Sequence, residues 1–485
     1  MTVAMLKKIM PLRKSLIIKN SFWGLISNLV QNIFLSLFFL IMARLYSTEE
    51  FAYYLIANTL YQFVAAFSAL GLGQWFIREV VAVTDKEALI HRFLKMQFVF
   101  GMLFFFVNVL LGFLLYDTAI IRVLSVLLGL NVVFDNLIYA VKHVNIAEYT
   151  QKNTFLVLGI EATSKFLIGC LLFLYPLSII TLSAILIALR FITLNLFLRL
   201  GSPGGVNLTQ FWRSPLAYKQ VKELVSENWP FIVIGSISII YWRIGSIIVS
   251  KTLTLADVAN YEIAIKLFTM AQLLPVIVSV TVFPKLSKLY KEGLQAEFKS
   301  LYRKVFLLYL LFGLLSFTFI YSFSDLLLPL AFGAKYAETA IYTKQIFLTI
   351  LVFPTALLQA NILVAIKLEK LDMYFNILSL VLNVLLCLVG LYFMKSLMVV
   401  SLSIFASFLI FHLSQDIVLL KRRITSLKDI LFFYVVSAVL VISYTYAHYY
   451  FPGFVVFSTY WLVIFLAIYV AFFRKNSPAL LDVIK

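Results

Sequence analysis

Apolar runs about 20 residues long follow one another along almost the whole chain. A run of this length crosses the hydrocarbon core of a bilayer as an α-helix, which rises about 1.5 Å per residue. Strands of a transmembrane barrel are only half as long, and an open sheet would leave backbone groups unpaired in the hydrocarbon. Hydrophobic residues make up 63% of the chain, far more than a soluble protein of 485 residues can bury. The sequence therefore predicts an all-α integral membrane protein.

Fourteen such runs can be separated, and each is expected to form one transmembrane helix. Their ranges are 20–43, 51–77, 93–116, 119–141, 153–174, 177–198, 229–250, 260–284, 304–323, 341–366, 373–394, 397–420, 430–449 and 454–473. The loops are short, and the longest, at 201–228, begins with glycine, proline and serine as a linker does. Its Tyr218–Glu227 stretch is expected to lie on the membrane as an amphipathic helix.

The long loop divides the chain into five expected segments. Residues 1–19 form a basic cytoplasmic tail, and residues 20–200 form an N-terminal lobe of six helices. After the cytoplasmic linker at 201–228, residues 229–420 form a C-terminal lobe of six helices. Residues 421–485 hold the last two helices and a second cytoplasmic tail.

Lysine and arginine are distributed unequally over the two sides of this arrangement. With the N-terminus inside, 30 of the 40 basic residues fall on the cytoplasmic side and six on the opposite side. Basic residues gather in the cytoplasmic loops of membrane proteins, so both termini are expected in the cytoplasm. The same rule and an attraction to anionic lipid account for the net charge of +18 without a nucleic-acid partner.

Residue patterns that carry catalysis or hold a cofactor are missing from the sequence. Cys170 and Cys387 lie in separate apolar runs, and the four histidines have no zinc-ligand spacing. A nucleophile elbow, a P-loop and an ATP-binding domain are also missing. We therefore expect no enzyme, no cofactor and no metal. Energy for transport would come from an H⁺ or Na⁺ gradient, from the membrane potential, or from downstream consumption of the substrate.

A repeat with a constant offset of 207 residues joins the first two helices to the seventh and eighth. The matched positions are Arg44 with Lys251, Ser47 with Thr254, Glu50 with Asp257, Ala52 with Ala259, Tyr54 with Tyr261, Ile56 with Ile263, Ala57 with Ala264 and Leu60 with Leu267. Apolar helices resemble one another by chance, but this order of basic, turn, acidic and tyrosine positions recurs at the same topological point. It predicts two pseudo-symmetric six-helix lobes, as in transporters that rock two bundles around a site between them.

Five stretches that carry a family resemblance follow one another in order along most of the chain. They are KNSFWGLISNLVQNIFLSLFFLIMARLYSTEEFAYY (Lys19–Tyr54), LGLGQWFIREVV (Leu70–Val81), YWRIGSIIVSKTLTLADVANYEIAIKL (Tyr241–Leu267), FPKLSKL (Phe283–Leu289) and AFGAKYAET (Ala331–Thr339). Together they resemble the MOP exporter superfamily, specifically its polysaccharide transporter branch, the Wzx-type flippases of lipid-linked oligosaccharides.

This resemblance implies a MATE-like fold in the bacterial inner membrane. The implied substrate is an undecaprenyl-diphosphate-linked oligosaccharide, either O-antigen or a similar repeat unit. The implied partners are the polymerase and chain-length regulator of the same pathway. Family members often carry Arg-x-Asp in the seventh helix, whereas this chain reads Arg243-Ile244-Gly245. The resemblance therefore does not imply that carboxylate-dependent ion coupling is retained.

Polar side chains form stripes on the first two expected helices. Asn28, Gln31 and Asn32 lie on one face of the first helix, and Asn58 and Gln62 are four residues apart on the second. Hydrogen bonds between helices would explain them. The alternative is the wall of a water-filled cavity, which the position of both stripes on adjacent helices favours.

Ionisable side chains at membrane depth are expensive, so they are expected to face a cavity or one another. They are Asp135, Glu161, Lys165, Arg190, Arg243, Glu262 and Lys266. Glu161 with Lys165 and Glu262 with Lys266 share a spacing of four, so each pair can close within its own helix. Because four bases stand against three acids, the alternative is a cationic cavity that binds an anion such as a lipid diphosphate.

Arg243 is the leading candidate for gripping the diphosphate. Lys165 and Lys266 each have a glutamate one turn away, and Arg190 can reach Glu161 on the preceding helix. Arg243 has no acid in its own helix, and its planar donor fork suits a phosphate. The alternative is that Arg243 reaches Asp135 or extends outward to the interface.

The sequence bears on three possible functions: a flippase, a drug exporter, and a polymerase or ligase. A flippase would take the lipid-linked oligosaccharide from the inner leaflet and expose it outside by alternating access. A MATE-type ion-coupled drug exporter generally has twelve helices and suits an acidic cavity. An integral-membrane polysaccharide polymerase or ligase should carry a large outer loop, whereas the longest here is expected at Ser324–Ala340. The flippase is the leading hypothesis.

Overall fold

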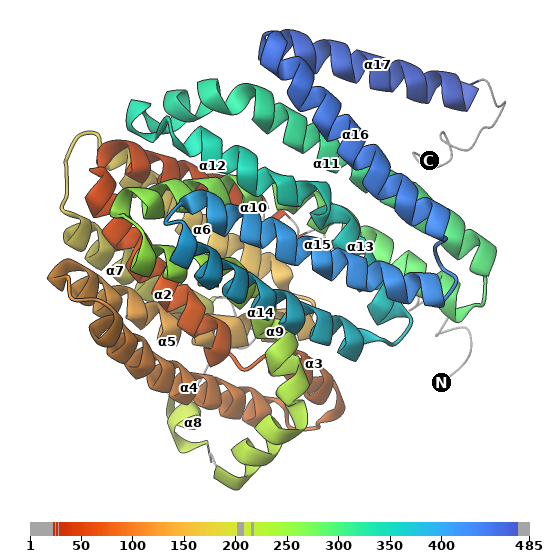
Figure 1. Cartoon of the computed structure of the whole chain (residues 1–485). Coiled ribbons are helices and arrows are strands. Elements are labelled where there is room, and N and C mark those ends of the chain that lie inside the picture. The colour runs from red at the N-terminus through yellow and green to blue at the C-terminus, as the bar shows by residue number, and fades with distance from the viewer. Residues whose placement is uncertain (1–22, 25, 28, 201–207, 215–217, 474–485) are drawn as a thin grey trace. The chain divides into compact units, whose positions relative to one another are not determined.

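The computed structural model describes residues 23–473 except residues 25, 28, 201–207 and 215–217, and every regular element in these residues is a helix (Figure 1). An apolar helix at Leu29–Leu45 comes first. The others are α2 (Thr48–Ser68), α3 (Gly73–Ala82), α4 (Lys86–Leu115), α5 (Ala119–Ala147), α6 (Gln151–Leu171), α7 (Ile179–Arg199), α8 (Leu208–Arg213), α9 (Tyr218–Thr252), α10 (Leu255–Lys291), α11 (Gln295–Phe332), η1 (Ala334–Tyr336), α12 (Thr339–Ile346), η2 (Phe347–Leu351), α13 (Phe353–Ala365), α14 (Glu369–Phe393), α15 (Leu397–Lys421), α16 (Leu427–Tyr450) and α17 (Gly453–Phe473).

Eleven helical segments of the described residues are long and apolar enough to cross a membrane. The fourteen predicted segments all coincide with helices, and the three outside the eleven lie at Leu29–Leu45, α2 and α9. The predicted all-α integral membrane fold is confirmed. It follows from hydropathy alone, because a bilayer admits only segments that pair their own backbone groups.

The second predicted helix, at 51–77, is interrupted in the structure. α2 ends at Ser68 and α3 begins at Gly73. Between them, Leu70 and Gly71 adopt φ angles of 50° and 57°. Two consecutive left-handed residues cannot continue a right-handed helix, and glycine adopts this conformation at little cost. The prediction of one continuous helix here is wrong, because hydropathy does not register a local reversal of the backbone.

Two other helices extend past their predicted ends. Tyr218–Glu227 is helical, as predicted. It does not form a separate helix, however, because it continues into the span at 229–250 as part of α9. α5 reaches Ala147 and so includes Lys142, which had been expected in a loop. Hydropathy marks where a helix leaves the hydrocarbon, and the helix itself can continue into polar surroundings. A position of Tyr218–Glu227 on the membrane surface stays a prediction.

The chain divides into two compact units. Unit 1 comprises Met1–Lys266 and Met373–Ser403, and unit 2 comprises Leu267–Asp372 and Ile404–Lys485. The division passes through α10, α14 and α15, whereas the predicted division lies at the 201–228 linker. That prediction rests on pseudo-symmetry between lobes, and it stays a prediction.

In unit 1, α5 packs against α2, α4 and α7, and Figure 1 shows α4 and α5 side by side. Small side chains permit this close approach. A methyl group at Gly101 of α4 would lie 2.9 Å from the Cα atom of Val133 on α5. The buried Asn108 amide on α4 donates to the carbonyl of Ser125 at 2.8 Å. α5 thus packs closely against several helices of this unit.

The predicted repeat is visible in the caps of α2 and α10. The Ser47 and Glu50 side chains cap each other's backbone N–H groups at 3.3 and 3.2 Å. Thr254 and Asp257 form the same reciprocal pair at 3.1 and 3.2 Å, 207 residues later. This is the capping-box arrangement, in which two N–H groups without helical partners are satisfied at once. The sequence match therefore corresponds to the same local structure at both positions.

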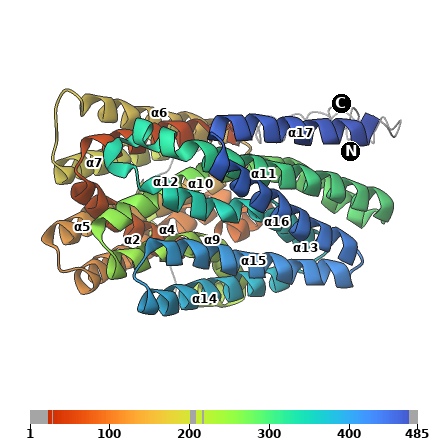
Figure 2. The ribbon, with the colours of Figure 1, turned by 45° about the horizontal axis from the view of Figure 1, so that its top comes forward.

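In unit 2, α11 packs against α12, α13, α16 and α17 (Figure 2). Thr318 of α11 joins the last two helices to it. The Trp461 indole donates to the Thr318 hydroxyl at 2.9 Å, and the Tyr444 hydroxyl donates to its carbonyl at 3.1 Å. Hydrogen bonds of this kind hold helices together where lipid provides no hydrophobic drive.

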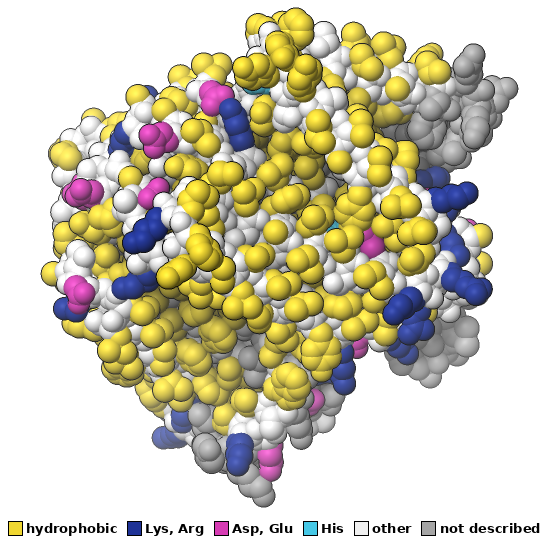
Figure 3. Space-filling model, in the orientation of Figure 1, with side chains coloured by type: hydrophobic (Ala, Val, Ile, Leu, Met, Phe, Trp, Pro, Cys, Tyr) yellow, Lys and Arg dark blue, Asp and Glu magenta, His cyan; other side chains and the backbone are white. Residues whose placement is uncertain are grey.

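The outer surface has the character that a lipid environment requires. Hydrophobic side chains predominate on the face shown in Figure 3, and lysine and arginine gather toward its margins. Large apolar side chains such as Leu114, Phe393 and Phe454 are at least 70% exposed. Soluble monomers rarely present apolar patches of this extent. The chain is a multi-pass integral membrane protein.

Candidate functional site

A cavity of about 260 Å³ lies within unit 1. Side chains from the helix Leu29–Leu45 and from α2, α5, α6, α7 and α10 line it. Seven of the predicted site residues are among them: Gln31, Asn58, Gln62, Glu161, Lys165, Arg190 and Lys266. Both polar stripes predicted from the sequence therefore reach one cavity wall.

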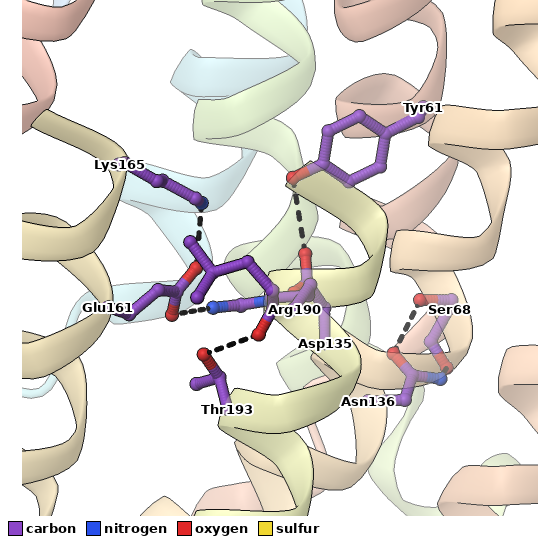
Figure 4. A network of polar contacts seen from close by, with 9 residues as sticks. Tyr61, Ser68, Asp135, Asn136, Glu161, Lys165, Arg190 and Thr193 are labelled. Atoms are coloured by element: carbon purple, nitrogen blue, oxygen red, sulfur yellow. Dashed lines mark hydrogen bonds and ion pairs between the residues drawn. The ribbon is translucent and has the colours of Figure 1, made fainter. Parts of the chain in front are cut away.

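Arg190 of α7 is the centre of a charged network beside this cavity (Figure 4). Its Nε donates to the Asp135 carboxylate of α5 at 3.0 Å. Its Nη1 forms an ion pair with Glu161 of α6, whose other oxygen lies 2.6 Å from the Lys165 ammonium. The Tyr61 hydroxyl of α2 donates to Asp135 at 3.2 Å. We call these five residues the Arg190 cluster.

The Arg190 cluster is balanced in charge. Two carboxylates stand against two cations, and Glu161 is only 2% exposed while it contacts both of them. A buried charge is tolerated when its partners satisfy its hydrogen bonds, and removal of one partner leaves an uncompensated charge. Four helices meet in this cluster, so its main consequence is to hold α2, α5, α6 and α7 together.

A second charged group lies at the start of α10. The buried Glu262 carboxylate accepts a hydrogen bond from the Thr59 hydroxyl of α2 at 2.9 Å. Its other oxygen lies 3.5 Å from Nη1 of Arg243 on α9. Lys266, one turn further along α10, places its ammonium 5.9 Å from the centre of the Phe39 ring. We call Thr59, Arg243, Glu262 and Lys266 the Glu262 group.

The Glu262 group differs from the Arg190 cluster in its charge. It holds one acid and two bases, so the excess positive charge expected from the sequence is located here. A cation over an aromatic face is stabilised without being neutralised. Lys266 also lines the cavity. The group therefore presents net positive charge beside the space that a ligand would enter.

Arg243 has no acidic partner in its own helix, as the sequence indicates, but the structure gives it one from another helix. Glu262 of α10 faces it, and the predicted alternative of Asp135 is bound by Arg190 instead. The pairing could not be read from one helix, because the acid comes from the next one. Arg243 is also missing from the described residues that line the cavity.

The departure from the family's Arg-x-Asp pattern has a steric reason. A methyl group at Gly245 would lie 2.1 Å from the hydroxyl oxygen of Tyr261, which is 1% exposed. No carboxylate fits at position 245 while this tyrosine keeps its place. Tyr54, the counterpart of Tyr261 in the repeat, instead lines the cavity. The two copies of the repeat have thus taken different roles.

The structure adds residues that the sequence analysis did not select. Tyr54, Tyr61 and Asn131 line the cavity. The spacing of Tyr54, Asn58, Tyr61 and Gln62 places them on one helix face, so an extended stripe could have revealed the tyrosines. Asn131 lies one turn before Asp135 on α5, which is a similar signal.

The other predicted site residues are placed as follows. Asn28 lies outside the described residues. Asn32 is half-buried and is not among the described residues that line the cavity. Asp135 and Glu262 are not among them either, and each is the partner of an arginine. Lys142, two turns after Asp135 on α5, acts electrostatically on Arg190, Asp135 and Glu161.

Comparison with solved structures defines the type of fold. A lipid II flippase MurJ in an inward closed conformation is 12% identical and covers 94% of this chain and 99% of its own, with a TM-score of 0.72. An inward-facing multidrug resistance MATE transporter of the MOP superfamily is 10% identical, with coverages of 82% and 96% and a TM-score of 0.67. A MOP superfamily transporter from Pyrococcus furiosus, described as having a binding pocket of reversed polarity, is 12% identical, with coverages of 85% and 96% and a TM-score of 0.53. The fold of the chain is similar to that of these MOP superfamily and MurJ structures.

The family follows from the sequence match. The family described as "Polysaccharide biosynthesis protein" matches residues 41–341, which is more than half of the chain. The chain belongs to this family. A search of curated proteins finds no match. The chain is therefore a membrane protein of the polysaccharide biosynthesis family with a MOP-like fold, and the resemblance seen in the sequence is confirmed.

Proposed function

We propose that the chain is a flippase that moves an undecaprenyl-diphosphate-linked oligosaccharide across the bacterial inner membrane by alternating access. O-antigen or a similar repeat unit is the saccharide, and both termini are cytoplasmic. The observation that carries the proposal is the cationic lining of the unit 1 cavity. Among the described residues that line it, Lys165, Arg190 and Lys266 are basic and only Glu161 is acidic.

The diphosphate is the part of such a substrate that this cavity suits. Its negative charge is attracted by Lys266, which belongs to the group with the excess positive charge. A cavity of about 260 Å³ has the volume of about nine water molecules in the liquid. That space accommodates a diphosphate but no complete oligosaccharide. The sugars therefore require a wider conformation, and the lipid tail remains in the bilayer.

A MATE-type exporter of cationic drugs is less consistent with the charges. Such a substrate needs an available carboxylate at the unit 1 cavity. Asp135 and Glu161 contact Arg190, and Glu262 contacts Arg243 and Thr59. To bind a cationic drug, each acid would have to release its arginine. The released guanidinium would then be buried without a partner, which is costly.

A polymerase or ligase is also less consistent with the structure. The loop predicted at Ser324–Ala340 was the largest candidate for sugar chemistry outside the membrane. α11 continues to Phe332 and α12 begins at Thr339, so only a short connection with η1 remains. We therefore place the polymerase and the chain-length regulator among partner proteins that use the transported product.

Reconstitution tests the function directly. Purified protein in liposomes that carry a fluorescent undecaprenyl-diphosphate oligosaccharide in both leaflets is treated with a membrane-impermeant quencher. Flippase activity makes the protected inner-leaflet fraction accessible, with no increase in saccharide length. Protection that persists would contradict the flippase, and longer saccharides would support the polymerase.

A further inference from the structure

A second buried polar group lies in unit 2, among α11, α13, α15 and α16. The Asp416 carboxylate of α15 accepts from the Gln359 amide of α13 at 2.6 Å and from the Tyr434 hydroxyl of α16 at 2.8 Å. His412, one turn earlier on α15, places its Nδ1 3.3 Å from the same carboxylate and in contact with the Tyr434 hydroxyl. Three helices thus converge on one carboxylate.

This group is buried and has no permanent cation. Asp416 is 3% exposed and His412 is fully buried. Within the described part of the chain, His412 is the one basic side chain within ion-pair distance of Asp416. A buried carboxylate without a fixed counter-charge is costly at membrane depth. The charge of the group therefore depends on its protons, in contrast to the Arg190 cluster, where arginine fixes the charge.

The Nε2 atom of His412 can accept a proton. His412 Nε2 is buried and has no hydrogen-bond partner in the described structure. When Nδ1–H donates to Asp416, Nε2 carries a lone pair and the His–Asp pair has a charge of −1. Uptake of one proton at Nε2 makes an imidazolium and brings the pair to zero. Histidine is the side chain whose charge ordinarily changes between pH 5 and 8.

A cavity of about 190 Å³ reaches this group from the surface of unit 2. Asp416, Tyr302 and Thr425 line it together with Arg303 and Asp429. The Arg303 and Asp429 side chains pair at 3.1 Å and are 63% and 42% exposed. The volume corresponds to about six water molecules in the liquid. Water in the cavity would join the buried carboxylate to the solvent, which supplies a route for protons.

We propose that His412 and Asp416 form a proton-binding site in unit 2, reached through this cavity, whose occupancy makes transport respond to a pH gradient. The transport clause rests on the proposed function, whereas proton binding does not. Tyr434 and Gln359 belong to different helices, so their hydrogen bonds to the Asp416 carboxylate hold α13 and α16 to α15. An imidazolium at His412 attracts the same carboxylate more strongly, so proton uptake weakens these two hydrogen bonds by competition and loosens the contact.

Other titratable and charged groups face the site from each neighbouring element. α11 contributes Tyr302, which acts electrostatically on Asp416, and Arg303. α16 contributes Tyr434 and Asp429, and the latter is paired with Arg303. Asp372, at the start of α14, accepts from Gln415 of α15 at 2.9 Å. α13 contributes the uncharged Gln359. The exposed Arg303–Asp429 pair is balanced, which leaves His412 and Asp416 to respond to pH.

The histidine content of the chain permits a direct test without substrate. The chain has four histidines, so protein labelled with ¹⁵N-histidine in nanodiscs gives four sets of ring resonances. His412→Gln assigns one of them. We expect this resonance to report proton uptake by the His412 ring as the pH is lowered. In Asp416→Asn the midpoint of this change should differ from that of the unmodified protein, because the imidazolium loses its carboxylate.

Two controls keep this test decisive. Asp325→Asn alters an exposed aspartate paired with Lys344 elsewhere in unit 2, and it should leave the His412 midpoint unchanged. If Asp416→Asn does not fold, the titration of the unmodified protein still decides. A His412 resonance that stays neutral down to pH 5, or an unchanged midpoint in a folded Asp416→Asn, would overturn the proton-binding site.

Transport in liposomes tests the second clause. An imposed pH gradient should change the translocation rate of the unmodified protein and of Asp325→Asn several-fold, and should have no effect on Asp416→Asn. Equal gradient responses in all three proteins would overturn the link to transport. The titration result is independent of which lipid-linked saccharide is carried, so failure of the proposed substrate would not produce failure of the proton site.

Discussion

The Arg190 cluster and the Glu262 group contain similar residues but differ in net charge. Each contains a glutamate followed by a lysine four residues later, together with one arginine from another helix. In the Arg190 cluster, Asp135 supplies a second acid and the charges cancel. In the Glu262 group, the neutral Thr59 hydroxyl takes the corresponding place, and positive charge is left over. One acidic residue thus separates a group that stabilises a helix bundle from one that can attract an anion.

The largest expected effect is on the Arg190 cluster. Glu161→Gln leaves Arg190 and Lys165 without their shared carboxylate, which should reduce the free energy of unfolding by about 3–5 kcal/mol. Thermal unfolding in detergent, followed by tryptophan fluorescence, measures the loss. Glu292→Gln is the matched control, since it breaks the exposed Lys288–Glu292 pair at the same spacing and should cost less than about 0.5 kcal/mol. If Glu161→Gln and Glu292→Gln are equally stable, the structural role assigned to the Arg190 cluster is wrong.

The equivalent change in the Glu262 group should have a different result. Glu262→Gln keeps an oxygen that can accept from Thr59, but it removes the carboxylate facing Arg243. We expect a stability loss of about 1–3 kcal/mol and a tighter binding of pyrophosphate-containing lipid, because the positive charge rises by one. Isothermal titration with a short-chain prenyl diphosphate measures the affinity. Weaker binding would contradict the role of excess positive charge in this group.

The contact between Gly245 and Tyr261 tests how the two copies of the repeat differ, because Tyr54, the counterpart of Tyr261, lines the cavity instead. Gly245→Ala puts a methyl group where the Tyr261 hydroxyl lies, and should destabilise the protein by about 1–3 kcal/mol. In a Tyr261→Phe background the cost should fall, since the next tyrosine atom is 3.0 Å away. A double-mutant cycle on thermal unfolding measures the coupling. Additive effects would contradict the steric explanation.

The smallest expected effect concerns Tyr61. Tyr61→Phe removes one hydrogen bond to Asp135, which Arg190 still contacts. The free energy of unfolding should fall by about 1 kcal/mol, with little change in diphosphate affinity. A loss of affinity tenfold or greater would instead place Tyr61 in direct contact with the ligand.

Much of the fold could be predicted because hydropathy and local spacing determine it. The fourteen helical segments follow from apolar length, and the caps at Ser47 and Thr254 follow from the repeat. The Glu161–Lys165 pair follows from a spacing of one turn. The reach of Arg190 to Glu161 was expected from their similar depth, and it is confirmed.

The rest depends on contacts between helices that sequence spacing does not encode. The partner of Arg243 is on α10, and nothing in α9 identifies it. The break at Leu70 and Gly71 depends on backbone angles that are invisible to hydropathy. The role of Gly245 becomes clear only when Tyr261 is seen to occupy the place of its missing side chain. These features are tertiary, and they decide how the site differs from the family pattern.

The central claim is that the excess positive charge of the Glu262 group binds the diphosphate of the substrate. Binding of a short-chain prenyl-diphosphate saccharide to purified Lys266→Ala tests it most directly. Lys288→Ala, at an exposed position on the same helix, is the control. The account predicts a loss of affinity of about ten- to a hundred-fold for Lys266→Ala and an unchanged affinity for Lys288→Ala. Unchanged affinity in a folded Lys266→Ala would contradict it.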